Sequence, residues 1–314
     1  MLTVLFFGPV LLGLALLSFG RLLGTRSFLI ASVVPLIAFG WAVAQATGVL
    51  DGDVPTATLE WVPALGLDID LRLDGFSLLF VLLVAGIGTL VQIYAFQYFP
   101  KDREEVHRLA GLLLVFTAAM LALVTSANLL VLFVAWELTS ITSYLLIGWT
   151  DKDPKARASA LQALLTTGLG GIAMLGGFVL IGQAAGTYDI AALAAHPPTG
   201  TTVEVGLVLV LLGAFTKSAQ FPFSAWLPGA MVAPTPVSAF LHSATMVKAG
   251  VYLIARFAPI FAAQGIWRPL VLTVGLLTML TGGWHALHQY DLKRILAFGT
   301  VSQLGFMVVL FGAG

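Results

Sequence analysis

The sequence contains no cysteine, and only 10% of its 314 residues are charged. The absence of cysteine excludes a disulfide framework, a thiolate metal site and a cysteine nucleophile. Soluble domains carry roughly 25% charged residues, so a chain with so few charges cannot cover a soluble surface. Its 15 basic residues equal its 15 acidic residues, which argues against the basic stripe of a nucleic-acid-binding protein.

Hydrophobic sequence dominates instead, at 59% of all residues, and apolar runs long enough to cross a bilayer recur from end to end. This pattern predicts an all-α polytopic membrane protein with about ten transmembrane helices. The N-terminus is apolar from Met1 and has no basic segment, so it predicts a first span and not a removable signal peptide. The predicted spans cover about residues 2–20, 28–50, 75–97, 109–126, 129–149, 158–184, 204–221, 236–257, 268–288 and 294–312.

Several of these helices have recognisable start signals. Asp74 precedes the third predicted helix, Asp153 with Pro154 the sixth, and Thr235 with Pro236 the eighth. Each places a capping side chain or a first-turn proline where unpaired backbone N–H groups need one.

The longest polar stretch runs from Asp51 to Asp74 and contains six acidic residues and one arginine. It is short enough to form a structured loop, such as a hairpin.

The basic residues predict how the chain crosses the membrane, because cytoplasmic loops are enriched in Lys and Arg. Ten fall in one set of alternate loops and three in the other, so the first set is predicted to be cytoplasmic, with the N-terminus outside. The ten are Arg21, Arg26, Lys101, Arg103, Arg108, Lys152, Lys155, Arg157, Lys293 and Arg294. The three are Arg72, Arg256 and Arg268.

Three ionisable residues lie near the middle of hydrophobic segments: Glu137, Lys217 and Lys248. A charge at the bilayer centre costs about 2.5 to 3.5 kcal/mol on insertion scales, so three of them indicate a function. A buried ion pair that only fixes helix packing is the structural alternative. Such a pair would leave one lysine without a partner, because the spans contain two such lysines and one such carboxylate.

Polar neighbours extend two of these positions into stripes. At 100° per residue, the stripe on the eighth predicted helix stays within an arc of about 120°. It comprises Ser238, His242, Thr245, Lys248 and Tyr252, with Phe240, Val247, Val251 and Ile254 on the opposite side, facing lipid or a packed helix. Glu137, Ser140 and Tyr144 form a shorter stripe on the fifth helix. Hydrogen-bonding contacts between helices would explain the hydroxyls but not the lysine.

Four prolines follow Lys217 within nineteen residues: Pro222, Pro228, Pro234 and Pro236. Pro222 cannot donate to the carbonyl of Ser218 and clashes with that turn, so the seventh helix should break just past Lys217. Broken helices at membrane depth are tolerated where they line a wet or protein-enclosed cavity, and in transporters they mark the ion site.

Minor candidates have simpler explanations. His285 and His288 lack a third metal ligand, which favours interfacial hydrogen bonding. Glycines of the sixth helix predict close helix packing, since no strand precedes them for a nucleotide loop. They are Gly168, Gly170, Gly171, Gly176 and Gly177.

The segment from Lys217 to Arg256 reads KSAQFPFSAWLPGAMVAPTPVSAFLHSATMVKAGVYLIAR. It closely resembles the core of the antiporter-like subunits shared by respiratory complex I and the Mrp-type multisubunit cation/proton antiporters. Three further segments are similar to that family: LRLDGFSLLF from Leu71, FVAWELTSITSYLLIG from Phe133 and DLKRILAFGTVSQLGFM from Asp291.

The resemblance implies an antiporter-like fold and a proton relay. It implies that Glu137 pairs with Lys217, and that protons pass by His242 and Thr245 to Lys248. It also implies three parts: N-terminal helices in residues 1–108, a complete five-helix repeat (helices four to eight) in 109–260, and the start of a second, inverted repeat in 261–314. The chain stops partway through that repeat, which suggests a truncated chain or a second half on another polypeptide.

The assignment to one branch of the family depends mainly on Lys248. The chain reads HSATMVKAG where the complex I subunit usually reads HAATMVTAG, and a lysine there is more similar to the A-type subunit of Mrp antiporters. The predicted function is a subunit of an Na⁺/H⁺ antiporter in the cell membrane, with other antiporter subunits, Na⁺, H⁺ and lipid as partners and no redox cofactor. A proton-pumping subunit of complex I is the main alternative, and a purely structural scaffold is the third.

Overall fold

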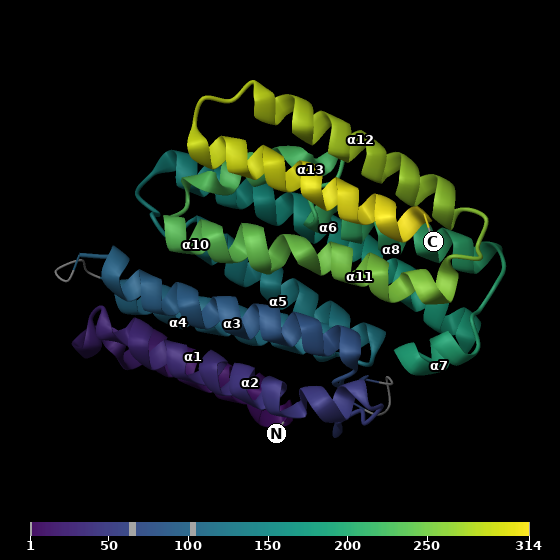
Figure 1. Cartoon of the computed structure of the whole chain (residues 1–314), viewed down its shortest axis with the longest axis horizontal. Coiled ribbons are helices and arrows are strands. Elements are labelled where there is room, and N and C mark those ends of the chain that lie inside the picture. The colour runs from purple at the N-terminus through teal and green to yellow at the C-terminus, as the bar shows by residue number, and fades with distance from the viewer. Residues whose placement is uncertain (1, 63–66, 101–104, 314) are drawn as a thin grey trace. The chain divides into compact units, whose positions relative to one another are not determined.

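A computed structural model describes residues 2–62, 67–100 and 105–313 of the chain, and most of them are helical (Figure 1). The longer helices are α1 (Leu2–Phe19), α2 (Arg26–Leu50), α3 (Gly75–Tyr98), α4 (Val106–Thr125), α5 (Leu129–Ile147), α6 (Pro154–Ala185), α8 (Thr201–Lys217), α11 (Met246–Phe261), α12 (Trp267–Leu287) and α13 (Leu292–Ala313). Shorter elements are η1 (Gly20–Leu23), α7 (Ile190–Ala195), η3 (Phe223–Ala225), α9 (Trp226–Gly229), η4 (Ala230–Val232), α10 (Thr235–Ala239) and the π-helix η5 (Phe240–Ala244).

The all-α prediction is confirmed, with nine helices in the described residues long and apolar enough to cross a membrane. Ten were expected. The difference lies in the seventh predicted span, 204–221, which is α8 and has 17 residues because it ends at Lys217. The eighth predicted span is present but is not one regular helix, since α10, η5 and α11 follow one another through it.

The helix starts agree with the predicted signals at all three positions, through a capping side chain at two of them and a first-turn proline at the third. Asp74 accepts a 2.9 Å hydrogen bond from the N–H of Ser77 at the start of α3. Asp153 accepts one of the same length from the N–H of Lys155 at the start of α6. Helix α10 begins at Thr235 itself, so Pro236 lies in its first turn and Thr235 is not its cap.

The acidic stretch before α3 contains the predicted hairpin. Its strands β1 (Thr56–Val62) and β2 (Leu67–Arg72) pair in antiparallel register, with Thr56 opposite Arg72. A bridge between Leu71 and Ser126 attaches β2 to the turn between α4 and α5. The N–H of Ala127 also donates to the carbonyl of Asp70 at 2.8 Å. The hairpin therefore holds that turn by its backbone.

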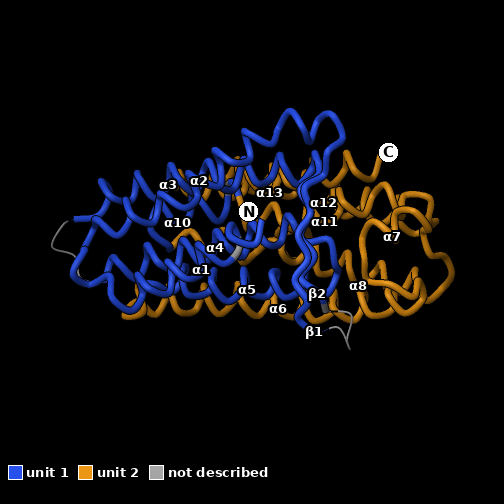
Figure 2. The backbone as a smooth tube through the Cα atoms, turned by 90° about the horizontal axis from the view of Figure 1, so that it is seen from below, with its two compact units in different colours: residues 1–149, 233–244 blue, residues 150–232, 245–314 orange. Residues whose placement is uncertain are grey.

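The chain divides into two compact units, coloured separately in Figure 2. Unit 1 comprises residues 1–149 and 233–244, and unit 2 comprises residues 150–232 and 245–314. The predicted division at residues 108 and 260 follows the expected repeat and remains a prediction.

Helix α4 is the best-buried helix of unit 1. Nearly all of its residues are inaccessible to solvent, as expected for a helix that contacts α1, α2, α3 and α5. Phe240 of η5 packs edge-on against Phe116 of α4, with ring centroids 5.6 Å apart. The π-helical turn is thereby fixed to the core of this unit.

In unit 2, α6 lies against α8 and α12 against α13. The glycine prediction for α6 is confirmed at Gly170 and Gly177, where a Cβ would collide with Thr216 and with the carbonyl of Gly206. No atom lies within 4 Å of a Cβ built on Gly168, so that position does not contribute to close packing.

Candidate functional site

Lys217 is the last residue of α8 and its side chain is fully buried. The chain leaves the helix at once: Ser218 is the C-cap, and Ala219 has a left-handed φ of 49°. Pro222 follows within one turn, where it cannot continue the hydrogen-bond ladder. The predicted break just past the lysine is therefore confirmed.

The backbone freed at this break is bonded by protein groups. The N–H of Gln220 donates to the carbonyl of Phe215 at 2.8 Å. The indole of Trp226 donates to the carbonyl of Thr216 at 3.0 Å. The N–H of Phe221 donates to the hydroxyl of Thr278, on α12, at 2.8 Å. Of the two settings expected for a broken helix, these bonds match the protein-enclosed one.

Lys248 lies in the first turn of α11, half-buried, and belongs to unit 2 with Lys217. The hydroxyl of Ser218 donates to the carbonyl of Val247 at 2.6 Å, joining the end of α8 to the start of α11. The residue after one lysine is thus bonded to the residue before the other.

Gly250 permits this approach of α8 to α11. A Cβ at this position would collide with the carbonyl of Ala214 and the hydroxyl of Ser218. Ala214 and Ser218 belong to the last turn and the C-cap of α8. The absence of a side chain at Gly250 therefore allows the two lysine-bearing helices to touch.

The predicted polar stripe does not follow one regular helix. Residues Phe240–Ala244, including the buried His242, form a π-helix, and Thr245 leaves helical geometry at φ −128° and ψ −86°. A step of 100° per residue applies only to the α-helix, so the 120° arc expected from Ser238 to Tyr252 is wrong. π-Helical turns are rare and frequently occur at functional sites.

The residues expected opposite the stripe are buried, which agrees with a packed face and not with a lipid-facing one. They are Phe240, Val247, Val251 and Ile254.

Glu137 lies on α5 in unit 1, in a partly buried position. Helix α5 starts at the cap residue Asn128, whose side chain accepts from the N–H of Leu130 at 2.8 Å. One turn beyond Glu137, the hydroxyl of Ser140 donates to the carbonyl of Trp136 at 3.3 Å.

The five predicted relay residues are divided between the units. Glu137 and His242 belong to unit 1, while Lys217, Thr245 and Lys248 belong to unit 2. Within unit 2 the structure brings the two lysine-bearing helix ends together. Sequence reasoning missed Ser218, which joins them, and Thr278, which binds the chain after Lys217 to α12, because single hydroxyls in apolar helices give no distinguishing pattern.

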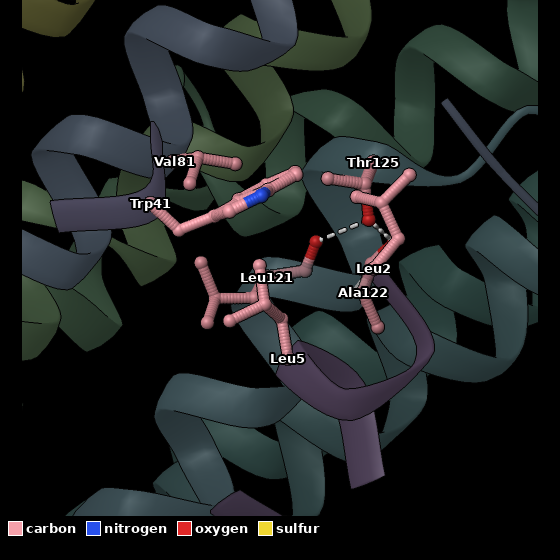
Figure 3. Close-up of a pocket in the computed structure, with 7 residues that line it drawn as sticks. All are labelled: Leu2, Leu5, Trp41, Val81, Leu121, Ala122 and Thr125. Atoms are coloured by element: carbon pink, nitrogen blue, oxygen red, sulfur yellow. Dashed lines mark hydrogen bonds between the residues drawn. The ribbon is translucent and has the colours of Figure 1, made fainter. Parts of the chain in front are cut away.

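Other features of the described residues offer weaker sites. His285 and His288 each bond through Nδ1 to the carbonyl four residues earlier, at 2.7 and 2.8 Å. No group of three metal-ligating side chains occurs in the part of the chain that is described. A small cavity of unit 1, about 10 Å³, has room for about one water, and Figure 3 shows its lining of largely apolar side chains around Thr125. The Thr125 hydroxyl is already bonded to the carbonyl of Leu121 at 2.8 Å.

Comparison with known proteins identifies the family. The family model described as "NADH:quinone oxidoreductase/Mrp antiporter, TM" matches residues 126–314, more than half of the chain. The chain belongs to this family. A second model, described as the N-terminus of chain 5 of NADH-ubiquinone oxidoreductase (complex I), matches residues 61–108.

Curated relatives agree with the resemblance to the A-type subunit of Mrp antiporters. The chain is 48% identical over 285 residues to the A-type subunit of the Na⁺/H⁺ antiporter of Alkalihalophilus pseudofirmus, covering 90% of this chain and 35% of the relative. It is 47% identical over 291 residues to the A/B-type subunit of a probable K⁺/H⁺ antiporter of Rhizobium meliloti, covering 90% and 29%. The chain therefore spans about a third of the length of these relatives.

Solved structures share the fold. The Mrp complex from Dietzia sp. DQ12-45-1b matches with a TM-score of 0.85 and 37% identity, over 100% of this chain and 34% of the other. An archaeal membrane-bound sulfane sulfur reductase matches with a TM-score of 0.87 and 25% identity, over 99% and 64%. With its apolar helices, the chain is thus a multi-pass membrane protein similar to the A-type subunit of Mrp antiporters.

Proposed function

We propose that the chain forms part of a subunit of a multisubunit antiporter that exchanges Na⁺ for H⁺ across the cell membrane, together with other antiporter subunits. The observation that carries the proposal is Lys217, a fully buried ionisable residue at the break of α8. Ionisable residues inside membrane spans mark ion and proton pathways. The choice of Na⁺ and H⁺ as the exchanged ions follows the name of a similar subunit.

The proton path is proposed to run from Glu137 and Lys217 by way of His242 and Thr245 to Lys248. Glu137 stabilises the protonated Lys217 while the two are paired, and weakening that pair releases the proton. A change of one pKa unit corresponds to about 1.4 kcal/mol, so a modest change in pairing is enough to redirect it. The bond from Ser218 to Val247 supports the last step, since it fixes the spacing of the two lysine-bearing helix ends.

The proposed orientation places the N-terminus outside and the ten basic residues in the cytoplasm. In unit 1, a Cβ on Gly20 would lie 2.9 Å from His107, so the turn bearing Arg21 and Arg26 adjoins the start of α4. In unit 2, Lys155 lines the same groove as Lys293 and Arg294. Within each unit, these basic residues therefore lie close together, which supports placing them on the same side of the membrane. Lys101 and Arg103 fall outside the described residues.

The test uses inverted membrane vesicles that carry the whole complex, with a pH gradient across the membrane and no quinone or electron donor present. Added Na⁺ should dissipate the gradient, whereas a redox-driven subunit requires the electron donor. Lys217→Ala and Glu137→Gln should abolish the exchange, and Lys152→Ala, which removes an exposed cation near the start of α6, should not. Unchanged exchange in both site variants would falsify the relay.

A further inference from the structure

An open groove of about 780 Å³ lies at one end of unit 2, outside the proposed relay. Three segments form it: the first turns of α6, residues 228–232, and the turn between α12 and α13. Its volume lies within the range of roughly 300–1,000 Å³ that is typical of small-molecule sites. Inorganic phosphate alone would fill little of it.

Positive charge dominates the lining. Lys155, Lys293 and Arg294 face one carboxylate, that of Asp291. In the described part of the chain, neither Lys155 nor Arg294 has a carboxylate oxygen within 4.0 Å. Lys293 is anchored, because its ammonium donates to the carbonyl of Met231 at 3.1 Å. The groove is therefore an anion-attracting site with two exposed cations and one anchored cation.

Helix stability does not explain these cations. The first turn of a helix favours acidic residues, and basic residues there oppose the macrodipole. Asp153 already caps α6, and Asp291 caps α13 by accepting from the N–H of Arg294 at 2.9 Å. Lys155 and Arg294 therefore lie where their own helices disfavour them, which indicates that their charge serves something outside the helices.

Membrane orientation alone does not explain them either. Lys152 and Arg157 supply positive charge at the same end of α6 without lining the groove. Tyr290, which lines the groove, is fully exposed, and its neighbours Leu287 and Leu292 are 82% and 71% exposed. Exposed apolar and aromatic side chains next to basic ones are typical of the interface between the bilayer and water.

We propose that this groove binds the headgroup of one anionic phospholipid. Lys155 and Arg294 bind the phosphate, while Leu287 and Leu292 contact the glycerol and the start of the acyl chains. Basic pockets between transmembrane helices on the cytoplasmic side bind such headgroups. The apolar rim favours a lipid over free phosphate, because inorganic phosphate gains nothing from leucine side chains.

The experiment compares two double variants of the purified whole complex. Lys155→Gln with Arg294→Gln removes two groove cations, and Lys152→Gln with Arg157→Gln removes two cations of the same unit that lie outside the groove. Lys293 is left intact because of its bond to Met231. Each complex is titrated in nanodiscs with fluorescent phosphatidylglycerol, and the lipid retained on purification is measured by mass spectrometry.

We expect the groove variant to lose one retained anionic lipid per complex and to bind phosphatidylglycerol at least about tenfold more weakly, since hydrogen bonds to charged groups are the stronger ones. The control should match the parent. Equal loss in both variants, equal binding of phosphatidylcholine, or displacement by inorganic phosphate would each overturn the proposal. If the double variant does not assemble, Lys155→Gln alone replaces it, because that side chain is exposed.

Discussion

The hydroxyl of Ser218 donates a 2.6 Å hydrogen bond to the backbone carbonyl of Val247. Ser218 follows Lys217 and Val247 precedes Lys248, so this single bond ties together the backbone next to both lysines. A proton transfer between two groups depends on their separation, and rigid positioning shortens the search for a productive geometry. Ser218 is accordingly a positioning residue for the proposed relay.

Ser218→Ala should slow Na⁺-driven proton exchange several-fold and shift its pH profile, because the helix ends are no longer held in register. The hydrogen bond to the carbonyl of Val247 is also lost, at a net cost of about 0.5–1.5 kcal/mol of stability. Exchange in vesicles over a range of pH measures the effect. Thr300→Ala is the control, since that hydroxyl bonds within its own helix, to the carbonyl of Leu296. An unshifted pH profile in the Ser218 variant would leave the bond with a structural role alone.

Gly250→Ala should lower the stability of the protein by about 1–3 kcal/mol and reduce exchange, because the added methyl collides with α8 at Ala214 and Ser218. Gly168→Ala is a matched control on α6, since no atom lies within 4 Å of its Cβ. It should stabilise the helix by about 0.5–1 kcal/mol. Thermal unfolding of both variants in the same detergent distinguishes them. Equal melting temperatures would contradict the close contact of α8 and α11.

Thr278→Val should loosen the chain after Lys217. The N–H of Phe221 loses its acceptor on α12, and the loss of one such hydrogen bond costs about 0.5–1.5 kcal/mol. We expect faster amide hydrogen exchange at residues 218–223 and a lower exchange activity. Thr281→Val on the same helix removes a hydroxyl that bonds within α12, to the carbonyl of Leu277. That control should leave residues 218–223 protected, and equal protection in both variants would rule out the proposed anchor.

Asp74→Ala should destabilise the start of α3, because the side chain caps the N–H of Ser77. Removing a cap costs about 0.5–2 kcal/mol, and the 4.0 Å pairing with Arg72 is lost as well. Asp74→Asn keeps the cap and should retain most of the stability. The melting temperatures of the two variants measure the difference. Equal losses would show that the charge and not the cap is responsible.

Features encoded by neighbouring residues could be predicted from the sequence. The caps Asp74 and Asp153 act on the next helical turn, and Pro222 lies just past the end of α8, where it cannot continue the helix. The acidic stretch formed the expected hairpin, because it is polar and its apolar run is far too short to cross a membrane. These outcomes depend on a few adjacent residues, which the sequence displays directly.

Features that depend on distant partners could not be predicted. The π-helix at Phe240–Ala244 is packed against α4 through Phe116, and its own residues have an ordinary helical pattern. The contact of α8 with α11 needs Gly250 to meet Ser218, which lies 32 residues earlier in the chain. Fixed 100° steps therefore misplaced the polar stripe, although the sequence named the residues that form it.

The hairpin also determines where Glu137 lies, because it is attached at the start of α5. Strand β2 is bonded to the turn that precedes α5, and Glu137 is the ninth residue of that helix. At 1.5 Å per residue, its Cα lies roughly 13 Å along the axis from the attached end. The strand pair contains no relay residue, yet it holds the start of α5 and so fixes the distance of Glu137 from the hairpin. Lengthening the turn at Ser126 by one residue should therefore shift the carboxylate relative to the hairpin.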